Sequence, residues 1–397
     1  MIPFSNRTSW PSESNPLTRL AAQLREEKVP VLDLTLSNPT RCRFDYLKTD
    51  LLKNFLAPEN LFYDPDAYGL LPAREAVCRY YAAKGIPVKP AQVLMTASTS
   101  EAYSFLFRLL FEPGDLLLAP QPSYPLLDFL ASLNDVRVER YLLDPEQAWK
   151  LQPKSYYELG NAEPKAFLVV NPNNPTGNYL HEPELAEINL FCKPRRTAII
   201  SDEVFFDYPL TGANTAKPVS TAANNSQLTF TLSGISKILG LPQMKLSWII
   251  VSGPENETAE AMKRLEIISD TYLSVSTPVQ RALPQWLGMQ ETIQKEIRAR
   301  LEQNHQFLKN KFSGARHPVH LFPAEGGWHA VLRPPSERTD EDWACLLLKN
   351  DRVLTHPGYL FDFQEGSYLV LSLLVPHEDF RAGIEKIPVR VRESLSV

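Results

Sequence analysis

Side chains that can do chemistry stand directly after three apolar runs of the sequence. Lys237 follows the run LTFTLS, Asp202 ends the run TAIISD, and the amide-rich turn NPNNPTGN follows KAFLVV. Continuous Val, Ile and Leu runs are typical of buried parallel strands, and ligands bind where the carboxyl ends of such strands meet. We therefore expect a lysine, a carboxylate and an amide cluster to converge on one crevice.

A fourth apolar run, VLMT, leads to Ser98, Thr99 and Ser100 at the start of an apolar helical stretch. Free backbone N–H groups, the positive end of the helix dipole and three hydroxyls favour a phosphate there. Plain N-capping of the helix by serine or threonine is the alternative for this motif alone. A ligand with a phosphate, an aldehyde for the lysine and a ring nitrogen for the carboxylate would use all four features. Pyridoxal phosphate has these groups.

The elements that must position these residues form two predicted regions. Short apolar runs alternate with helical stretches through the middle of the chain, as in DLLLAP before PLLDFLASL. This alternation predicts an α/β fold with a mostly parallel, seven-stranded sheet between helices. After about residue 275 long helical stretches lead to a strand-rich end. We expect a large domain over residues 51–279 and a smaller α+β domain built from residues 1–50 and 280–397.

Composition narrows the class of protein. The chain has 397 residues, 44% of them hydrophobic, and a formal charge of −5, which leaves no basic face for nucleic acid. The four cysteines are far apart, without the CxxC or Cys/His clusters of metal sites, and are expected to be reduced. No apolar run reaches membrane-spanning length, and the first residues lack the apolar core of a signal peptide. We expect a cytoplasmic protein with no nucleic-acid or membrane partner.

Motifs in a fixed order then resemble the class I/II aminotransferases, fold-type I pyridoxal-phosphate enzymes of the aspartate aminotransferase superfamily. The motifs are FYDPDAYGLLPAREAV, TASTSEA, PSYP, NPNNPTG, SDEV, SGISKILGLPQMK and GGWHAVL. Each is weak alone, but the resemblance runs from about Leu32 to Phe380. It implies a homodimeric aminotransferase that moves an amino group from an amino acid to a 2-oxo acid by a ping-pong mechanism.

The resemblance also implies a role for each matching residue. Lys237 would form the Schiff base with pyridoxal 5'-phosphate and carry the substrate proton, and Asp202 would hold the pyridine nitrogen. The other cofactor-binding residues that it implies are Asn174 for the phenolic oxygen, Tyr124 stacked on the ring, Ser98, Thr99, Ser100 and Lys245 for the phosphate, and Tyr63 for the phosphate of the neighbouring subunit.

Two residues near the expected cofactor depart from the family pattern. Phe205 stands where the family usually has a tyrosine that donates to the phenolic oxygen. Loss of that donor predicts a raised pKa for the nitrogen that links Lys237 to the cofactor. Gly234 stands where a phosphate-binding serine is common, and Ser233 or Ser236 could compensate.

The largest departure concerns the substrate. Val370, in YLVLSLL, occupies the place of an arginine that grips the substrate α-carboxylate as a bidentate pair. Either another arginine takes this role, or the substrate lacks a conventional α-carboxylate. Arg41 is the preferred candidate, with Asn38 before it in LSNPTR on the substrate side. Arg43, Arg333 and Arg352 are less favoured, and a surface role is the alternative for each arginine.

Three hypotheses remain open at this point. An aminotransferase is favoured, while a lyase, decarboxylase or synthase on the same scaffold is kept because of Val370. A non-enzymatic cofactor-binding protein is disfavoured, because Lys237, Asp202 and Asn174 are all present. His329 and His356 belong to segments that approach the site in the family, although a structural role is favoured for each.

Overall fold

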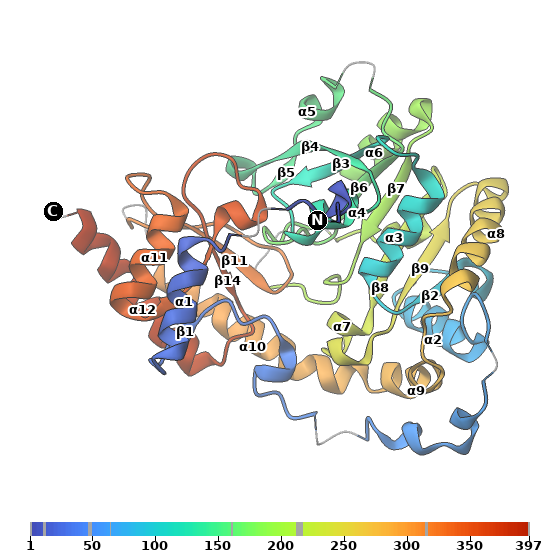
Figure 1. Cartoon of the computed structure of the whole chain (residues 1–397), viewed down its shortest axis with the longest axis horizontal. Helices are drawn as coiled ribbons and strands as arrows, with labels where there is room; N and C mark the ends of the chain where they lie inside the picture. The colour runs from blue at the N-terminus through green and yellow to red at the C-terminus, as the bar shows by residue number, and fades with distance from the viewer. Residues whose placement is uncertain are drawn as a thin grey trace.

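The structure is a computed structural model that describes residues 2–10, 13–46, 50–63, 65–159, 162–211, 217–313 and 317–395 (Figure 1). Its α-helices are α1 (Pro16–Glu26), α2 (Leu71–Ala82), α3 (Thr99–Leu110), α4 (Leu126–Leu133), α5 (Pro153–Tyr157), α6 (Glu182–Arg195), α7 (Ile235–Ile238), α8 (Glu255–Tyr272), α9 (Thr277–Gly288), α10 (Gln290–Lys311), α11 (Asp340–Asp351) and α12 (His377–Leu395). Its strands are β1 (Leu32–Asp33), β2 (Val93–Thr96), β3 (Leu116–Gln121), β4 (Arg137–Asp144), β5 (Lys150–Leu151), β6 (Ala166–Val170), β7 (Ala198–Asp202), β8 (Thr229–Gly234), β9 (Ser247–Ser252), β10 (His320–Leu321), β11 (His329–Arg333), β12 (Val353–Leu354), β13 (His356–Pro357) and β14 (Leu369–Ser372).

The central sheet has the strand order β2-β9-β8-β7-β6-β3-β4-β5. The pairs from β8 to β4 are parallel, whereas β9 is antiparallel to β2 and β8, and β5 is antiparallel to β4. The predicted α/β fold with a mostly parallel sheet is therefore confirmed. The sheet has eight strands within the described residues where seven were expected, and the shortest of them, β5, has two residues, too few to show a periodicity.

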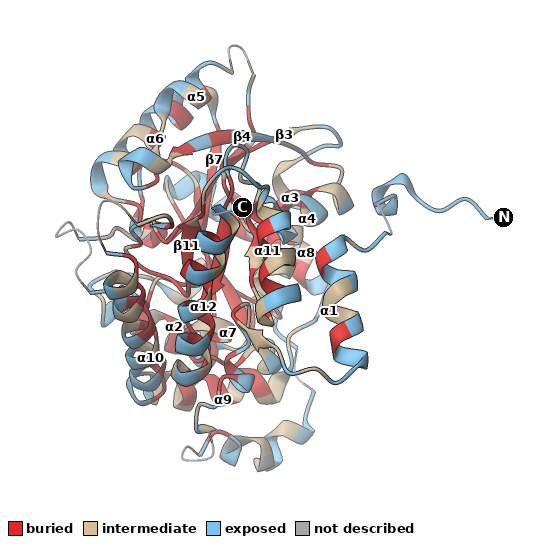
Figure 2. Ribbon diagram, turned by 90° about the vertical axis from the view of Figure 1, so that its left-hand side faces the viewer, coloured by how far each residue is buried: buried red, intermediate tan, exposed pale blue. Residues whose placement is uncertain are grey.

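Helices cover both faces of this sheet because its strands are apolar on both sides. Leu168 of β6 packs in one buried cluster with residues of α3, α4 and α8. Its neighbour Phe167 packs in another with residues of α5 and α6, as the alternation of side chains along a strand requires. Figure 2 shows the buried strands at the centre and the exposed faces on the surrounding helices.

A second sheet, with the antiparallel order β10-β11-β14-β13, lies beside α10, α11 and α12 (Figure 1). The N-terminal segment joins this region, because β1 pairs in parallel with β12 through Leu32 and Val353. The domain boundaries near residues 50 and 280 stay predictions. No helix within the described ranges is long and apolar enough to cross a membrane.

Candidate active site

Three neighbouring strands bring the predicted chemistry to one edge of the central sheet. In the register of β6, β7 and β8, Val170 lies opposite Asp202, and Asp202 lies opposite Leu232. The turn that carries Asn174 follows β6 directly, and α7 with Lys237 follows β8 directly. Parallel strands end at the same edge of a sheet, so the lysine, the carboxylate and the amide turn lie together.

The short helix α7 holds Lys237 through its backbone. The Tyr208 hydroxyl donates to the carbonyl oxygen of Lys237 at 2.6 Å, and the Gln294 amide donates to that of Ile238 at 2.9 Å. The Lys237 Nζ lies 5.3 Å from the ring centre of Phe205 and 5.0 Å from that of Trp328. Burial among these rings lowers the pKa of Lys237, against the opposing effect of the Asp202 charge. The amine is therefore more readily neutral, as a nucleophile must be.

Asp202 is the buried carboxylate that interacts with Lys237. It accepts a hydrogen bond from the Tyr103 hydroxyl at 3.1 Å and one from the Val204 N–H at 3.2 Å. Burial raises the pKa of Asp202 to about 6, although both hydrogen bonds and Lys237 oppose the shift. A carboxylate with this desolvation gains from a cationic partner such as a protonated ring nitrogen.

The adjacent Glu203 has a structural role instead. Its carboxylate accepts hydrogen bonds from the Ser220 hydroxyl at 2.6 Å and from the Thr221 N–H at 2.8 Å. Of the two acidic residues in SDEV, only Asp202 is therefore available to interact with a bound ligand.

The two amides of the NPNNPTG turn also divide their roles. The Asn173 amide donates to the Pro122 carbonyl oxygen at 3.1 Å and to the Thr176 hydroxyl at 2.7 Å, so it stabilises the turn. The Asn174 side chain makes no hydrogen bond within the described part of the chain, and its oxygen, like that of Asn173, is buried without a partner. A buried polar atom of this kind needs a partner that the protein itself does not supply.

Ser98, Thr99 and Ser100 lie at the start of α3, as predicted. The Ser98 hydroxyl accepts from the Glu101 N–H at 3.1 Å, so its side chain is an N-cap, which was the alternative to a phosphate ligand. Thr99 and Ser100 are half-buried in the first turn. Their hydroxyls and the N–H groups of this turn can therefore receive a phosphate.

The other residues predicted near the phosphate lie at the surface of the single chain. Lys245 is exposed and has a left-handed backbone with φ of 53°. Tyr63 is 76% exposed, beside the exposed residues Leu61 and Phe62.

Gly234 has a steric reason to be glycine. A Cβ atom there would lie 2.2 Å from the Ser247 side-chain oxygen, because β9 passes close to this position. A serine at position 234 would need that strand to move. Of the two serines expected to compensate, Ser233 is buried, whereas Ser236 is half-buried next to Lys237.

A neutral, buried residue stands at the position where the family has a carboxylate-binding arginine. Val370 is buried, and its neighbours across the sheet are Val331 and His356. The His329 Nε2 lies 3.2 Å from the Ser37 hydroxyl, and the His329 ring centre is 6.2 Å from that of Phe205. Burial, and to a smaller extent repulsion from His356 and Lys237, lowers the pKa of His329 to about 3. This imidazole is therefore neutral.

Arg41 and Asn38 belong to a 3₁₀ turn, Pro39–Arg41, whose segment contacts the loop after Lys237. The Tyr46 hydroxyl donates to the Gly240 carbonyl oxygen at 2.7 Å. Asn38 caps the turn through the Thr40 N–H at 3.1 Å, and the Arg41 side chain is exposed. Two other candidate arginines are engaged elsewhere: Arg43 pairs with Asp379 at 3.2 Å and Arg333 with Glu146 at 3.0 Å.

The structure adds residues that the sequence analysis did not assign. They are Tyr103 at the Asp202 carboxylate, Tyr208 at the Lys237 backbone, Trp328 beside the Lys237 amine and Ser37 at His329. Trp328 and Ser37 lie within motifs already singled out, GGWHAVL and LSNPT. Tyr103 and Tyr208 had no such signal, because their contacts join segments far apart in the sequence.

Comparisons with known proteins agree with this arrangement. Residues 29–387 match the family model for aminotransferases of class I and II. The chain is 29% identical to the glutamate-pyruvate aminotransferase AlaA of Haemophilus influenzae over 286 residues, 71% of this chain and 70% of that protein. It is 26% identical to an alanine aminotransferase of Mycobacterium bovis over 383 residues, 94% of this chain and 88% of that protein. The solved alanine aminotransferase from Pyrococcus furiosus has a TM-score of 0.88 at 22% identity, covering 98% of this chain and 100% of that chain.

The chain belongs to the class I and II aminotransferase family. It is a pyridoxal-phosphate-dependent aminotransferase, as the family match and the relatives named as aminotransferases establish. These comparisons confirm the predicted enzyme class and cofactor, and they do not favour the lyase alternative. The residues present fit the cofactor, because the lysine of lowered pKa and the desolvated carboxylate of Asp202 match its aldehyde and ring nitrogen, and the side-chain N–H of Asn174 is able to donate to its phenolic oxygen.

Substitution of Phe205 tests how the protein controls the pKa of the nitrogen that links Lys237 to the cofactor. We expect Phe205→Tyr to lower the pKa of the nitrogen that links Lys237 to the cofactor, because a new hydroxyl would stabilise the phenolate. The shift should be on the order of one pH unit, the size expected for one added hydrogen bond to a charged group. A spectral pH titration of both holoproteins measures it, and equal midpoints would contradict the assignment of Phe205 to the phenolic side.

Proposed function

We propose that this aminotransferase exchanges the amino group of a small neutral amino acid such as alanine with a 2-oxo acid. Two relatives support this substrate class, since they are named as glutamate-pyruvate and alanine aminotransferases. The observation that carries the proposal is the neutral wall beside Lys237, formed by the Phe205 ring, 5.3 Å from the Nζ, and the uncharged imidazole of His329. A short apolar side chain gains more from such a wall than a charged one does.

The proposed mechanism gives each residue a task at a stated atom. Bound pyridoxal phosphate supplies the ring that accepts electrons from the substrate Cα. The Lys237 Nζ would remove the proton from the Cα of the amino donor and, in the second half-reaction, deliver a proton to the Cα of the 2-oxo acid, tasks for which its lowered pKa is suited. Asp202 holds the proton on the ring nitrogen, Asn174 binds the phenolic oxygen and the Tyr124 ring stacks on the cofactor. Thr99, Ser100 and Lys245 bind the phosphate, with Ser98 as the helix cap.

Arg41 is the proposed ligand of the substrate α-carboxylate. It lies on the segment that contacts the loop after Lys237, and it makes no ion pair within the described ranges. Arg43, two residues further on, is paired with Asp379. The guanidinium of Arg41 is therefore available to an incoming carboxylate, with which it can form a bidentate pair.

A matched pair of variants tests this role. We expect Arg41→Ala to raise the KM for alanine about tenfold or more with the cofactor band unchanged, because a hydrogen bond to a charged group is lost. Arg43→Ala should leave the KM near the wild-type value. Steady-state kinetics with alanine and a 2-oxo acid gives both numbers. Equal KM values in Arg41→Ala and Arg43→Ala would remove Arg41 from the site.

We further propose that two copies of the chain form the working enzyme in the cytoplasm. The exposed side chains of Leu61, Phe62 and Tyr63 support this assembly, since a run of exposed apolar residues is typical of an interaction surface. In such a dimer Tyr63 would reach the phosphate of the partner's cofactor, and the exposed Lys245 would become covered.

A further inference from the structure

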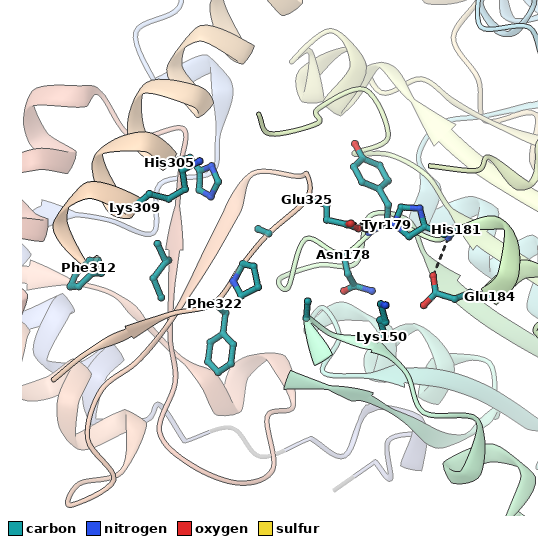
Figure 3. Close-up of a pocket in the computed structure, with 14 residues that line it drawn as sticks. Lys150, Asn178, Tyr179, His181, Glu184, His305, Lys309, Phe312, Phe322 and Glu325 are labelled. Atoms are coloured by element: carbon teal, nitrogen blue, oxygen red, sulfur yellow. Dashed lines mark hydrogen bonds and ion pairs between the residues drawn. The ribbon is translucent and has the colours of Figure 1, made fainter. Parts of the chain in front are cut away.

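A cavity of about 430 Å³ lies between the central sheet and the four-stranded sheet (Figure 3). Lys237 is not among the residues that line it. None of its lining residues is one that we assign to the cofactor or the substrate. One wall comes from α10 and the residues around β10, and the other from β5, the segment after the NPNNPTG turn and α6. Its volume lies within the range of roughly 300–1,000 Å³ that is usual for small-molecule sites.

The wall formed by α10 presents a buried group without a partner. His305 and Lys309 are four residues apart, so they lie on the same face of the helix, and both line the cavity (Figure 3). The His305 side chain is 4% exposed, and its Nδ1 has no hydrogen-bond partner among the described residues. Burial lowers the pKa of His305 to about 4, so the ring is neutral at physiological pH. A neutral imidazole with a free nitrogen can bind a polar group of a ligand.

The carboxylates of the cavity lining are hydrogen-bonded to neighbouring groups, whereas Lys309 has no ionic partner among the described residues. Glu325 already accepts from the Tyr179 N–H at 2.8 Å and lies 3.1 Å from the His181 Nε2, and Glu184 accepts from the His181 N–H at 3.0 Å. Lys309, in contrast, makes no ion pair within the described ranges, only a 3.4 Å hydrogen bond to the Thr211 carbonyl oxygen.

The remaining lining is largely apolar and includes rings. Phe312 at the end of α10, Leu321 of β10 and Phe322 after it are among the apolar residues that line the cavity with His305 and Lys309. Apolar walls of this kind favour a ligand with a hydrophobic body. Together with the free ammonium group, they point to an amphipathic anion.

We propose that this cavity binds a small carboxylic acid with an aromatic or branched apolar body. Its carboxylate would pair with Lys309 and accept from His305, and its body would lie against Phe312, Leu321 and Phe322. The bound acid would lie directly behind the active site, because the Gly177 carbonyl oxygen accepts from the Glu325 and Gly326 N–H groups at 2.9 Å. That junction joins the turn of Asn174 to the segment that leads to Trp328.

Isothermal titration of the wild-type holoprotein with 3-phenylpropionate tests the site. This acid has neither an amino nor an oxo group, so it is not turned over, and the variants below separate its binding in the cavity from binding in the active site. We expect binding that weakens about tenfold in Lys309→Met, because a hydrogen bond to a charged group is lost. Lys311→Met, a nearby lysine of α10 that does not line the cavity, should bind as the wild type does. The uncharged 3-phenylpropan-1-ol should bind about tenfold more weakly than the acid.

A cavity-filling variant separates this site from the active site. Leu321→Trp should abolish the heat of binding while its circular dichroism stays that of the wild type. The proposal is overturned if the acid gives no heat with the wild type. It is also overturned if Lys309→Met or Leu321→Trp binds the acid as tightly as the wild type, because the acid then occupies another place, such as the active site. If the Arg41 variants contradict the proposed substrate site while these binding results are obtained, the proposal for the cavity still holds.

Discussion

Lys237→Ala is expected to lower kcat for transamination by about 10⁴-fold, the upper range for loss of a positioned proton-transfer group. The variant would lose the amine proposed to bind the cofactor covalently and to move the Cα proton. The Lys237 Nζ is suited to both tasks, since it lies among Phe205 and Trp328 with a lowered pKa. Single-turnover kinetics measures the loss, and the visible band of the bound cofactor should shift to that of the free aldehyde.

Lys245 is the matched control for this variant. It is exposed, eight residues after Lys237, and it is proposed to bind only the phosphate. Lys245→Ala should weaken cofactor binding while keeping the covalent link, so borohydride reduction should still attach the cofactor to Lys237. Attachment at Lys245 in the wild type, located by peptide mass spectrometry, would contradict the assignment of the two lysines.

Asp202→Asn is expected to lower kcat by about 10²- to 10³-fold, because the ring nitrogen loses the negative charge that keeps it protonated. The asparagine keeps the shape of the side chain and its contact with Tyr103, so the effect isolates the charge. Steady-state kinetics at saturating cofactor measures it. A kcat within about threefold of the wild type would show that the carboxylate does not support the ring nitrogen, since a single charged contact is expected to contribute more.

The same variant should change how cofactor affinity depends on pH. Burial raises the pKa of Asp202 to about 6 in the chain without cofactor, whereas a protonated ring nitrogen beside it lowers that pKa. Below about pH 6 the carboxyl must lose its proton to bind the cofactor, so the affinity should fall about tenfold per pH unit as the pH decreases. Above that pH the ionisation of Asp202 should no longer change the cofactor affinity.

Asp202→Asn should lose this slope, and Glu203→Gln, the buried neighbour with a structural role, should keep it. Fluorescence titration of the apoprotein with pyridoxal phosphate between pH 5 and pH 8 measures the three curves. Identical slopes in wild type and Asp202→Asn would contradict the linkage.

Much of the fold and the position of the site could be predicted because long apolar runs report buried strands. The runs that end before Asn174, at Asp202 and before Lys237 are the adjacent parallel strands β6, β7 and β8. The two-residue strands could not be predicted, since β1, β5, β10, β12 and β13 are too short to show a period. They form through pairing with distant segments, as β1 does with β12.

Within the site, the predictable part is what a residue type and its place on a strand determine. The alternation of side chains places Asp202 and Glu203 on opposite faces, so their different partners follow from local geometry. The contact of Tyr103 with Asp202 and the approach of Ser247 to Gly234 depend on tertiary packing. Neither could be read from one sequence, because no local pattern encodes which side chains meet across the sheet.

The half-reaction of the wild-type holoprotein with alanine alone tests the central claim most directly. The visible band of the bound cofactor, the pyruvate formed and the ammonia released are measured in one experiment without any 2-oxo acid. Transamination through Lys237 predicts loss of the band, one pyruvate per active site and no ammonia, with the band restored by added 2-oxo acid. Continuing release of ammonia and pyruvate with the band retained would contradict this account.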